Sequence, residues 1–178
     1  MTTLTRRIPV LFASLLALAN GLALDWKTTG EHRWASLAGA GSGQPGFTLM
    51  NPAQTGVQFT NTLSTLILIS NKNLLNGSGV AMGDYDNDGH CDIYLCRLDG
   101  SNVMYRNLGD WKFEDTTAAT GTGCTSQFSS GATFADVDGD GDLDLFVTAM
   151  GQPNRLFRND GLGKFTDITA TSGIGTRV

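Results

Sequence analysis

Two short acidic loops contain the residues with the clearest chemistry in this sequence. Residues 84–92 read DYDNDGHCD and residues 136–144 read DVDGDGDLD, so both follow the pattern D-x-D-x-D-G-x-x-D. Ca²⁺ binds about six to eight oxygen ligands, and carboxylates on alternate residues around a glycine turn supply such oxygens from one short segment. Without a cation these neighbouring carboxylates would repel one another. The pattern therefore predicts a metal ion in each loop, the alternative being a solvated acidic turn that binds nothing.

The loops belong to a longer repeat with an offset of 52 residues between its copies (136 minus 84). At this offset, residues 79–123 align with residues 131–175 without a gap. Identical pairs include Asn102 and Asn154, Arg106-Asn107 and Arg158-Asn159, Lys112-Phe113 and Lys164-Phe165, and Thr117-Ala118 and Thr169-Ala170. A period near 50 residues is typical of a repeated supersecondary unit. We expect two copies, at about residues 77–123 and 129–175.

Each copy contains the pattern of four short strands that would position its loop. One strand enters the loop at residues 79–82 or 131–134, and another leaves it at 93–95 or 145–148. A hairpin then pairs residues 103–106 with 112–115, and 156–158 with 164–167 in the second copy. Four strands per period is the layout of a β-propeller blade. The predicted fold class is all-β, with residues 47–178 forming the repeat region.

The segment before the first copy is harder to interpret. Residues 55–61 alternate in polarity and residues 66–69 (LILI) are continuously apolar, so both are expected to be strands, the second one buried. Thr55-Gly56 resembles the Thr120-Gly121 and Ser172-Gly173 pairs that close the two copies. This similarity suggests the end of an earlier, degenerate unit.

The N-terminus has the layout of a secretory signal peptide. Arg6-Arg7 precede the apolar run VLFASLLAL, and small residues at 17–19 and 21–23 offer two cleavage positions. The run is shorter than the ~20 residues of a membrane-spanning helix. We therefore expect residues 1–23 to be a signal peptide, with no membrane span after cleavage, and the protein to be secreted, periplasmic or on the cell surface. Residues 24–46 form the expected flexible lead-in, helical or irregular over 26–37 and glycine-rich over 38–46.

Charge and composition narrow the classes of function. The net charge is −5, and more than half of the acidic residues lie in the two loops, so the acidity is local. Nucleic acid is not expected as a partner, because no stripe of basic residues is present to neutralise phosphates. The two histidines, His32 and His90, have no evident catalytic partner, and neither H-E-x-x-H nor G-x-S-x-G occurs. We therefore expect no enzymatic activity.

The three cysteines, Cys91, Cys96 and Cys124, leave two alternatives open. Cys91 and Cys96 are five residues apart on an expected strand, so their side chains face opposite sides and should not pair. A disulfide from Cys124 to one of them would suit an oxidising compartment. Alternatively, all three are small buried hydrophobic residues.

The loops differ from the common helical calcium motifs. An EF-hand requires an acidic residue at loop position 12 and helices on both sides. Leu95 and Val147 occupy position 12, and strands are expected on both sides. Dockerins and thrombospondin-type calcium repeats fail at the same position. In both loops the last acidic residue is therefore at position 9, Asp92 or Asp144.

The whole unit, from G-D-Y-D-N-D-G-x-x-D-I-Y-L to N-x-x-Y-R-N-x-G-x-x-K-F-x-D-T-T-A, resembles the FG-GAP/VCBS repeat family, and within it the UnbV/ASPIC and cartilage-acidic-protein group. The resemblance covers about residues 77–175 and implies a calcium-binding β-propeller, usually seven-bladed. It implies that side-chain oxygens come from Asp84, Asp86, Asp88 and Asp92 in the first loop and from Asp136, Asp138, Asp140 and Asp144 in the second, with the backbone carbonyls of His90 and Asp142 completing the sets.

The resemblance implies a secreted interaction module that binds an extracellular protein or glycan and in which Ca²⁺ is structural. The alternative is a non-catalytic accessory segment of a larger secreted polysaccharide-degrading enzyme. Even a four-bladed ring at this period would need more residues than the chain contains, so we expect about two full blades and a partial one from a longer propeller. Trp111, beside the first hairpin turn, either contacts sugar rings or packs on its own hairpin.

Overall fold

A computed structural model of the chain describes residues 26–30, 32–35, 47–70 and 77–174. The chain divides into two compact units, Met1–Phe47 and Thr48–Val178. The expected signal peptide and the glycine-rich linker at residues 38–46 lie outside the described residues. Within the described parts, no helix is long and apolar enough to cross a membrane.

The described part of the first unit is a β-hairpin. Strands β1 (Trp26–Thr29) and β2 (His32–Ala35) pair in antiparallel register, with Thr29 opposite His32. Gly30, at φ +60°, provides the left-handed backbone that the turn needs. The expectation of a helical or irregular lead-in is wrong for these residues, because tryptophan and threonine favour extended backbone.

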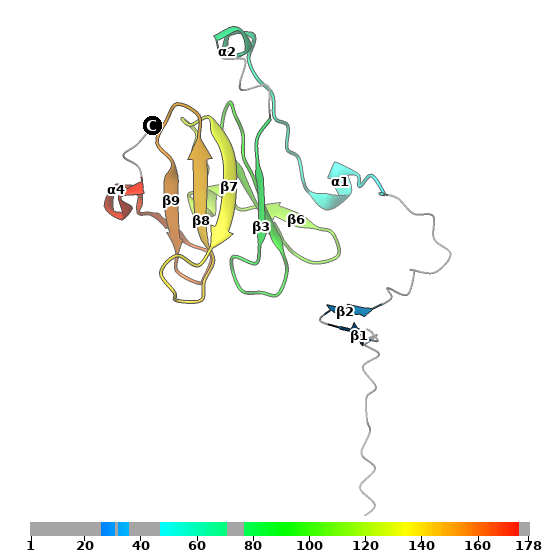
Figure 1. Cartoon of the computed structure of the whole chain (residues 1–178). Helices are drawn as coiled ribbons and strands as arrows, with labels where there is room; N and C mark the ends of the chain where they lie inside the picture. The colour runs from blue at the N-terminus through cyan, green and yellow to red at the C-terminus, as the bar shows by residue number, and fades with distance from the viewer. Residues whose placement is uncertain (1–25, 31, 36–46, 71–76, 175–178) are drawn as a thin grey trace, which may run out of the picture. The chain divides into compact units, whose positions relative to one another are not determined.

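The second unit contains two four-stranded antiparallel sheets, drawn in green and in yellow to orange in Figure 1. The first comprises β3 (Val80–Gly83), β4 (Asp92–Leu95), β5 (Val103–Asn107) and β6 (Phe113–Asp115). The second comprises β7 (Ser129–Ala135), β8 (Asp144–Ala149), β9 (Arg155–Asn159) and β10 (Phe165–Asp167). In both sheets each strand pairs with the next one along the chain. The prediction of two four-stranded, propeller-type blades is confirmed; they are called blade 1 and blade 2 below.

The blades pack through their first strands and share one hydrophobic core. Strands β3 and β7 lie side by side (Figure 1), and a Cβ added at Gly79 would lie 2.7 Å from the Cα of Gly131. Only glycine allows the two backbones to approach this closely. The core takes buried side chains from both blades: Ala81, Tyr85, Tyr94, Cys96, Met104, Leu145, Val147, Phe157 and Phe165. The two blades are therefore packed together as one body.

Three short helices end in the same way. Helices α1 (Pro52–Thr55), α3 (Thr117–Thr120) and α4 (Thr169–Ser172) are each followed by a glycine at positive φ, namely +82° at Gly56, +72° at Gly121 and +75° at Gly173. This shared cap supports the interpretation of residues 52–56 as the end of an earlier unit.

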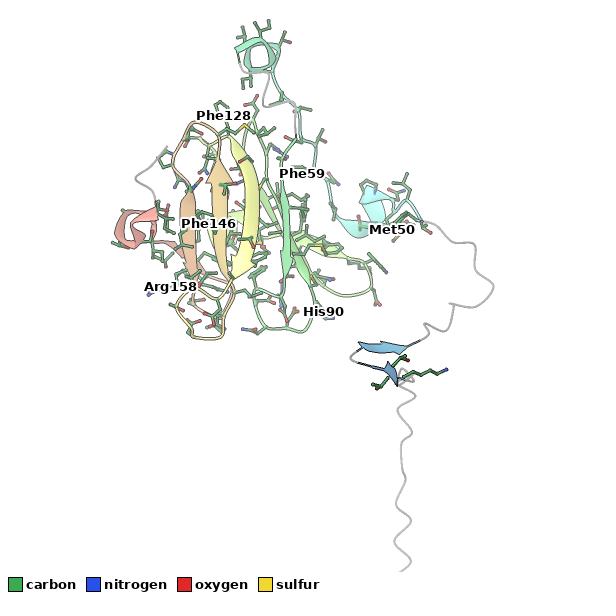
Figure 2. All side chains as sticks on the ribbon, viewed as in Figure 1. Met50, Phe59, His90, Phe128, Phe146 and Arg158 are labelled. Atoms are coloured by element: carbon green, nitrogen blue, oxygen red, sulfur yellow. The ribbon has the colours of Figure 1, made fainter. Side chains whose placement is uncertain are left out.

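The segment after α1 packs against blade 1. The backbone N–H of Gln58 donates to the Tyr105 hydroxyl at 3.0 Å. The Arg97 guanidinium lies 4.9 Å from the centre of the Phe59 ring, which is labelled in Figure 2. Residues 57–64 nevertheless form no strand, so the predicted strand at 55–61 is wrong.

The apolar run at residues 66–69 is also not a strand. It lies in helix α2 (Thr65–Ser70), where Leu66 is 81% and Ile69 74% exposed, so the predicted buried strand is wrong. The Ser64 hydroxyl accepts a hydrogen bond from the Ile67 N–H at 3.4 Å, as a helix N-cap does. A helix satisfies its backbone groups internally, and this segment has no partner strand in the described part of the chain.

The cysteines correspond fully to neither alternative. All three thiols are free: Cys96 is buried, Cys124 half-buried and Cys91 exposed. The disulfide from Cys124 is not formed, and Cys91 is not a core residue.

Candidate calcium-binding loops

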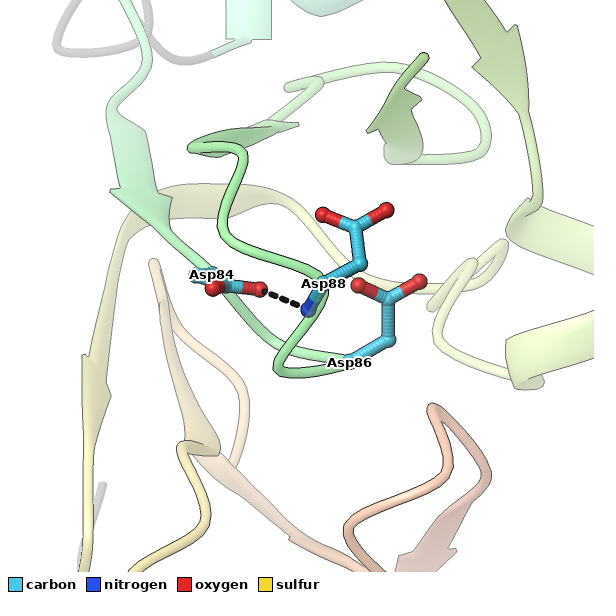
Figure 3. A group of neighbouring side chains, drawn as sticks. All are labelled: Asp84, Asp86 and Asp88. Carbon is cyan, nitrogen blue, oxygen red and sulfur yellow. Dashed lines mark hydrogen bonds between the residues drawn. The ribbon is translucent and has the colours of Figure 1, made fainter. Parts of the chain in front are cut away.

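Each acidic loop connects the first two strands of its blade, as the sequence predicts. Residues 84–91 join β3 to β4, and residues 136–143 join β7 to β8. The glycine of the D-G pair has positive φ in both loops, +88° at Gly89 and +96° at Gly141. This left-handed backbone turns the chain back toward the second strand of its blade. Figure 3 shows Asp84, Asp86 and Asp88 around the first turn.

The first aspartate of each loop holds the turn by accepting backbone hydrogen bonds. Asp84 accepts from the N–H groups of Asp88 at 3.1 Å and Gly89 at 2.8 Å. Asp136 accepts from Gly139 at 2.7 Å and Gly141 at 3.1 Å. Both loops are therefore shaped by the same contact between a carboxylate and the backbone.

The last aspartate of each loop ties it to the third strand of the blade. Asp92 is fully buried and accepts from the N–H groups of Tyr85 at 3.0 Å and Asn107 at 2.7 Å. Asp144 accepts equivalent bonds from Val137 at 2.9 Å and Asn159 at 2.8 Å. Burial raises the pKa of Asp92 to about 6.

Asn107 and Asn159 are site residues that the sequence reasoning missed. Besides their backbone contacts to the last aspartate, their side-chain amides donate to loop carbonyls, Asn107 to Cys91 at 2.9 Å and Asn159 to Leu143 at 3.1 Å. The sequence offered one indication of their importance, namely that the same residue type stands at both positions of the 52-residue repeat. The pattern does not reveal that this strand residue completes the loop from 15 positions away.

Three carboxylates converge in each loop. One oxygen each from Asp84, Asp86 and Asp88 lie within 4.8 Å of one another, and the same holds for Asp136, Asp138 and Asp144. Asp92 and Asp140 are outside these triplets, and the Asp140 carboxylate accepts from the Asp142 N–H at 3.0 Å. Among the residues expected to contribute carbonyls, His90 contacts Asp88 through Nδ1 at 3.2 Å, and the Asp142 carboxylate accepts from Asn87 at 2.8 Å.

The oxygen environment fits a hard cation. Asp86 Oδ1 is buried and accepts no hydrogen bond, although a carboxylate oxygen removed from water needs a donor or a cation. Partial desolvation and the negative charges of Asp140 and Asp144 raise the pKa of Asp138. Oxygen-only ligand sets of this kind suit Ca²⁺ and Mg²⁺ rather than softer metals.

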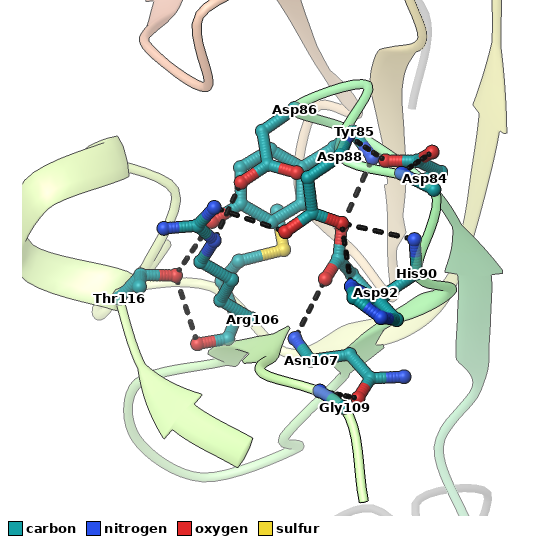
Figure 4. Close-up of polar contacts among 12 residues, drawn as sticks. Asp84, Tyr85, Asp86, Asp88, His90, Asp92, Arg106, Asn107, Gly109 and Thr116 are labelled. Atoms are coloured by element: carbon teal, nitrogen blue, oxygen red, sulfur yellow. Dashed lines mark hydrogen bonds and ion pairs between the residues drawn. The ribbon is translucent and has the colours of Figure 1, made fainter. Parts of the chain in front are cut away.

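The two loops differ in their nearest positive charge (Figure 4). Arg106, on β5, places Nε 2.6 Å from Asp86 Oδ2 and Nη2 2.9 Å from Asp88 Oδ2. The hydrogen bond to Asp88 raises the pKa of Arg106. Its repeat equivalent, Arg158, is exposed near the end of β9 (Figure 2) and forms no ion pair within the described residues.

Comparison with known proteins shows which family has this architecture. The chain matches the FG-GAP-like repeat family over residues 84–147 and 136–177. The chain belongs to this family. It is 33% identical over 95 residues to cartilage acidic protein 1 of Xenopus tropicalis, which covers 52% of this chain and 15% of that protein. It is 30% identical over 97 residues to cartilage acidic protein 1 of Homo sapiens, covering 53% and 15%.

These findings confirm the resemblance inferred from the sequence. The FG-GAP-like match begins at Asp84, so both matched segments start at the first aspartate of an acidic loop. The chain spans about 15% of the length of the curated relatives it matches. The family match therefore covers both acidic loops and the blade strands that follow them.

Proposed function

We propose that this chain is a calcium-binding FG-GAP module in which Ca²⁺ rigidifies each acidic loop. The observation that carries the proposal is the convergence of three carboxylates in each loop, together with the unpaired buried oxygen of Asp86. The ligands would be Asp84, Asp86, Asp88 and Asp92 with the His90 carbonyl, and Asp136, Asp138, Asp140 and Asp144 with the Asp142 carbonyl. A bound cation would remove the repulsion between carboxylates that the loop otherwise bears.

The role of the protein around the ion is positional. Asp84 and Asp136 fold the turn through backbone hydrogen bonds, while Asp92 and Asp144 fasten it to the third strand of the blade. Oxygens held in place before the ion arrives lose less conformational freedom when it binds. The expected outcome is a stiffer blade edge, with no catalytic step.

We further propose that the module is secreted and binds an extracellular protein or glycan. The signal-like N-terminus and the similarity to cartilage acidic protein 1 support this proposal. The loops of both blades connect equivalent strands, so they form one edge on which a partner can bind. Trp111 is 69% exposed at the β5–β6 turn and is therefore available for contact with a sugar ring.

The test is thermal unfolding of the chain after metal removal, with Ca²⁺ or Mg²⁺ added at about 2 mM. For a dissociation constant of about 0.1 mM, linkage predicts about 1.8 kcal/mol per site, or roughly 4–7 °C. Mg²⁺ should have a smaller effect because it requires stricter octahedral geometry. The double variant Asp86→Asn with Asp138→Asn should lose the response. A cooperative transition that is indifferent to Ca²⁺ would contradict the proposal.

A further inference from the structure

Tyr85 belongs to the first loop, yet its side chain is buried at the boundary between the blades. It is 3% exposed, and its ring lies 5.8 Å from that of Phe165 on β10 of blade 2, at an interplanar angle of 51°. Its hydroxyl forms a 3.0 Å hydrogen bond with Thr116 of blade 1. Tyr85 therefore connects the loop to side chains of both blades.

The backbone of the same residue is also held by blade 2. The Asn159 side-chain amide donates to the Tyr85 carbonyl at 2.6 Å, in a buried contact between residues 74 positions apart. A Cβ added at Gly163, in the β9–β10 turn, would lie 2.8 Å from the Tyr85 ring. The hairpin of blade 2 thus lies directly against the first loop.

Another residue of the first loop, Asn87, also makes a contact between the blades. Asn87, at φ +58°, donates from its side-chain amide to Asp142 Oδ1 at 2.8 Å. Along residues 84–88, Tyr85 and Asn87 alternate with the three converging aspartates. The residues that contact blade 2 and the residues that would bind the cation therefore lie on the same turn. Any change in the position of the carboxylates must move the contacts to blade 2.

Within the described residues, the second-loop positions that correspond to Tyr85 and Asn87 make no equivalent contacts, although Asp142 of this loop accepts the bond from Asn87. Val137 stands at the position of Tyr85 and is 49% exposed. Gly139 stands at the position of Asn87, and a Cβ placed there would have nothing within 4 Å. The two loops share their internal hydrogen bonds but differ in what surrounds them.

We propose that Ca²⁺ binding at residues 84–92 and docking of blade 2 stabilise each other, whereas Ca²⁺ at residues 136–144 acts mainly on its own blade and is coupled more weakly to blade 1, through Asp142 and Asn159. The proposal rests on the calcium-binding function proposed above. A cation fixes Asp84 and Asp86, and with them the backbone of Tyr85, which directs its carbonyl to Asn159 and its ring to Phe165. Coupling between two equilibria is reciprocal, so displacing the hairpin must weaken Ca²⁺ at this loop by the same factor.

The test uses the full chain with Asp138→Asn, which disables the second loop and leaves the first intact. Hydrogen exchange of residues 155–167 is measured without and with Ca²⁺, and binding of Ca²⁺ alone is measured by calorimetry. We expect Ca²⁺ to slow exchange in this hairpin of blade 2, although its loop cannot bind. In the reciprocal variant, Asp86→Asn in an otherwise unchanged chain, Ca²⁺ at the second loop should protect blade 2 itself and give little protection of the blade 1 hairpin at residues 103–115.

Gly163→Ala in the Asp138→Asn chain tests the reverse direction. Its Cβ must push against the Tyr85 ring, so Ca²⁺ affinity should fall by about fivefold or more. Gly173→Ala is the matched control, because it has a similar φ of +75° and nothing within 4 Å of its Cβ. Equal affinities in the two variants, or protection confined to blade 1, would overturn the coupling. An absence of Ca²⁺ binding in the unmodified chain would instead refute the proposed function.

Discussion

The Nε atom of Arg106 lies 2.6 Å from Asp86 Oδ2, so a positive charge of the protein already contacts a central carboxylate of the first loop. The same guanidinium reaches Asp88 Oδ2 at 2.9 Å. In the metal-free state this arginine offsets part of the repulsion among the carboxylates. When a cation binds there, the charges of the arginine and the metal compete for the same oxygens.

Arg106→Met should therefore lower the melting temperature of the metal-free protein by a few degrees and enlarge the increase produced by Ca²⁺. Methionine keeps most of the aliphatic stem, so the change isolates the charge. Thermal unfolding with and without Ca²⁺ measures both effects. Arg158→Met is the comparison, since Arg158 is exposed, forms no ion pair in the described residues and affects Asp138 of the second loop only through a weaker charge interaction. Identical metal-free melting temperatures for the two variants would refute this account of Arg106.

Asn159→Ala should destabilise the protein more than Asn107→Ala. Asn107 loses two side-chain hydrogen bonds, one donated to the Cys91 carbonyl and one accepted from the Gly109 N–H, but both lie near solvent, so the cost is about 1–2 kcal/mol. Asn159 loses two, to Leu143 and to the buried Tyr85 carbonyl, which is left without its donor, at a cost of about 2–4 kcal/mol. Urea denaturation of both variants provides the comparison. Equal losses would mean that the contact between the blades adds no stability.

The buried Asn102 gives a second comparison within the repeat. Its amide donates to the Tyr94 hydroxyl and to Ser129 of blade 2, both at 2.8 Å, and accepts from the Arg97 N–H at 2.7 Å. Asn102→Ala should cost about 3 kcal/mol or more, because buried partners remain unsatisfied. Asn154→Ala, which loses one bond from Ala149 at 3.1 Å, should cost about 1 kcal/mol. Chemical denaturation measures the free energy of unfolding of both variants. Equal losses would contradict the prediction.

The pH dependence of the metal-free protein should reflect Asp92. Burial raises its pKa in the folded state to about 6, above its ordinary value near 4. Between these values the folded state binds more protons than the unfolded state, so this carboxyl makes stability fall as pH rises from about 4 to about 6. Urea unfolding of metal-stripped protein across this range measures the slope. Asp92→Asn should remove the part of this pH dependence that comes from Asp92. An unchanged slope in the variant would mean that other groups cause the pH dependence.

Gly56→Ala should be more damaging than Gly121→Ala. Both glycines cap a short helix at similar positive φ, so the backbone strain is matched. A Cβ at Gly56 would overlap the Phe113 carbonyl, whereas one at Gly121 would meet nothing within 4 Å. Strain alone costs about 1 kcal/mol, and the overlap should add to it. Equal melting temperatures would mean that the α1 segment is not packed on β6 in solution.

The repeat made most of the blade architecture predictable. Two aligned copies place turn and strand signals at equivalent positions, so each copy checks the interpretation of the other. The pairing of β5 with β6 and the placement of both loops between first and second strands follow from this agreement. Strand pairing within a blade is local in sequence, which is where pattern reasoning is strongest.

The errors fall where no second copy exists or where a contact connects the two copies. Residues 66–69 have the composition of a buried strand but lack a strand with which to pair, and composition cannot show that absence. No role was predicted for Tyr85, because its burial depends on Phe165, 80 positions later (165 minus 85). Asn159 was missed for the same reason, since its contact to Tyr85 connects two copies rather than repeating within each.

The distribution of the cysteines has a practical consequence. Burial raises the pKa of Cys96 to about 12 and also raises that of Cys124, so both thiols resist conversion to the reactive thiolate. Cys91 is exposed and directly precedes Asp92 at the end of the first loop. A maleimide fluorophore will therefore label the unmodified chain beside this loop, without engineering. The native sequence carries its own attachment point for an optical sensor of whether the first loop is ordered.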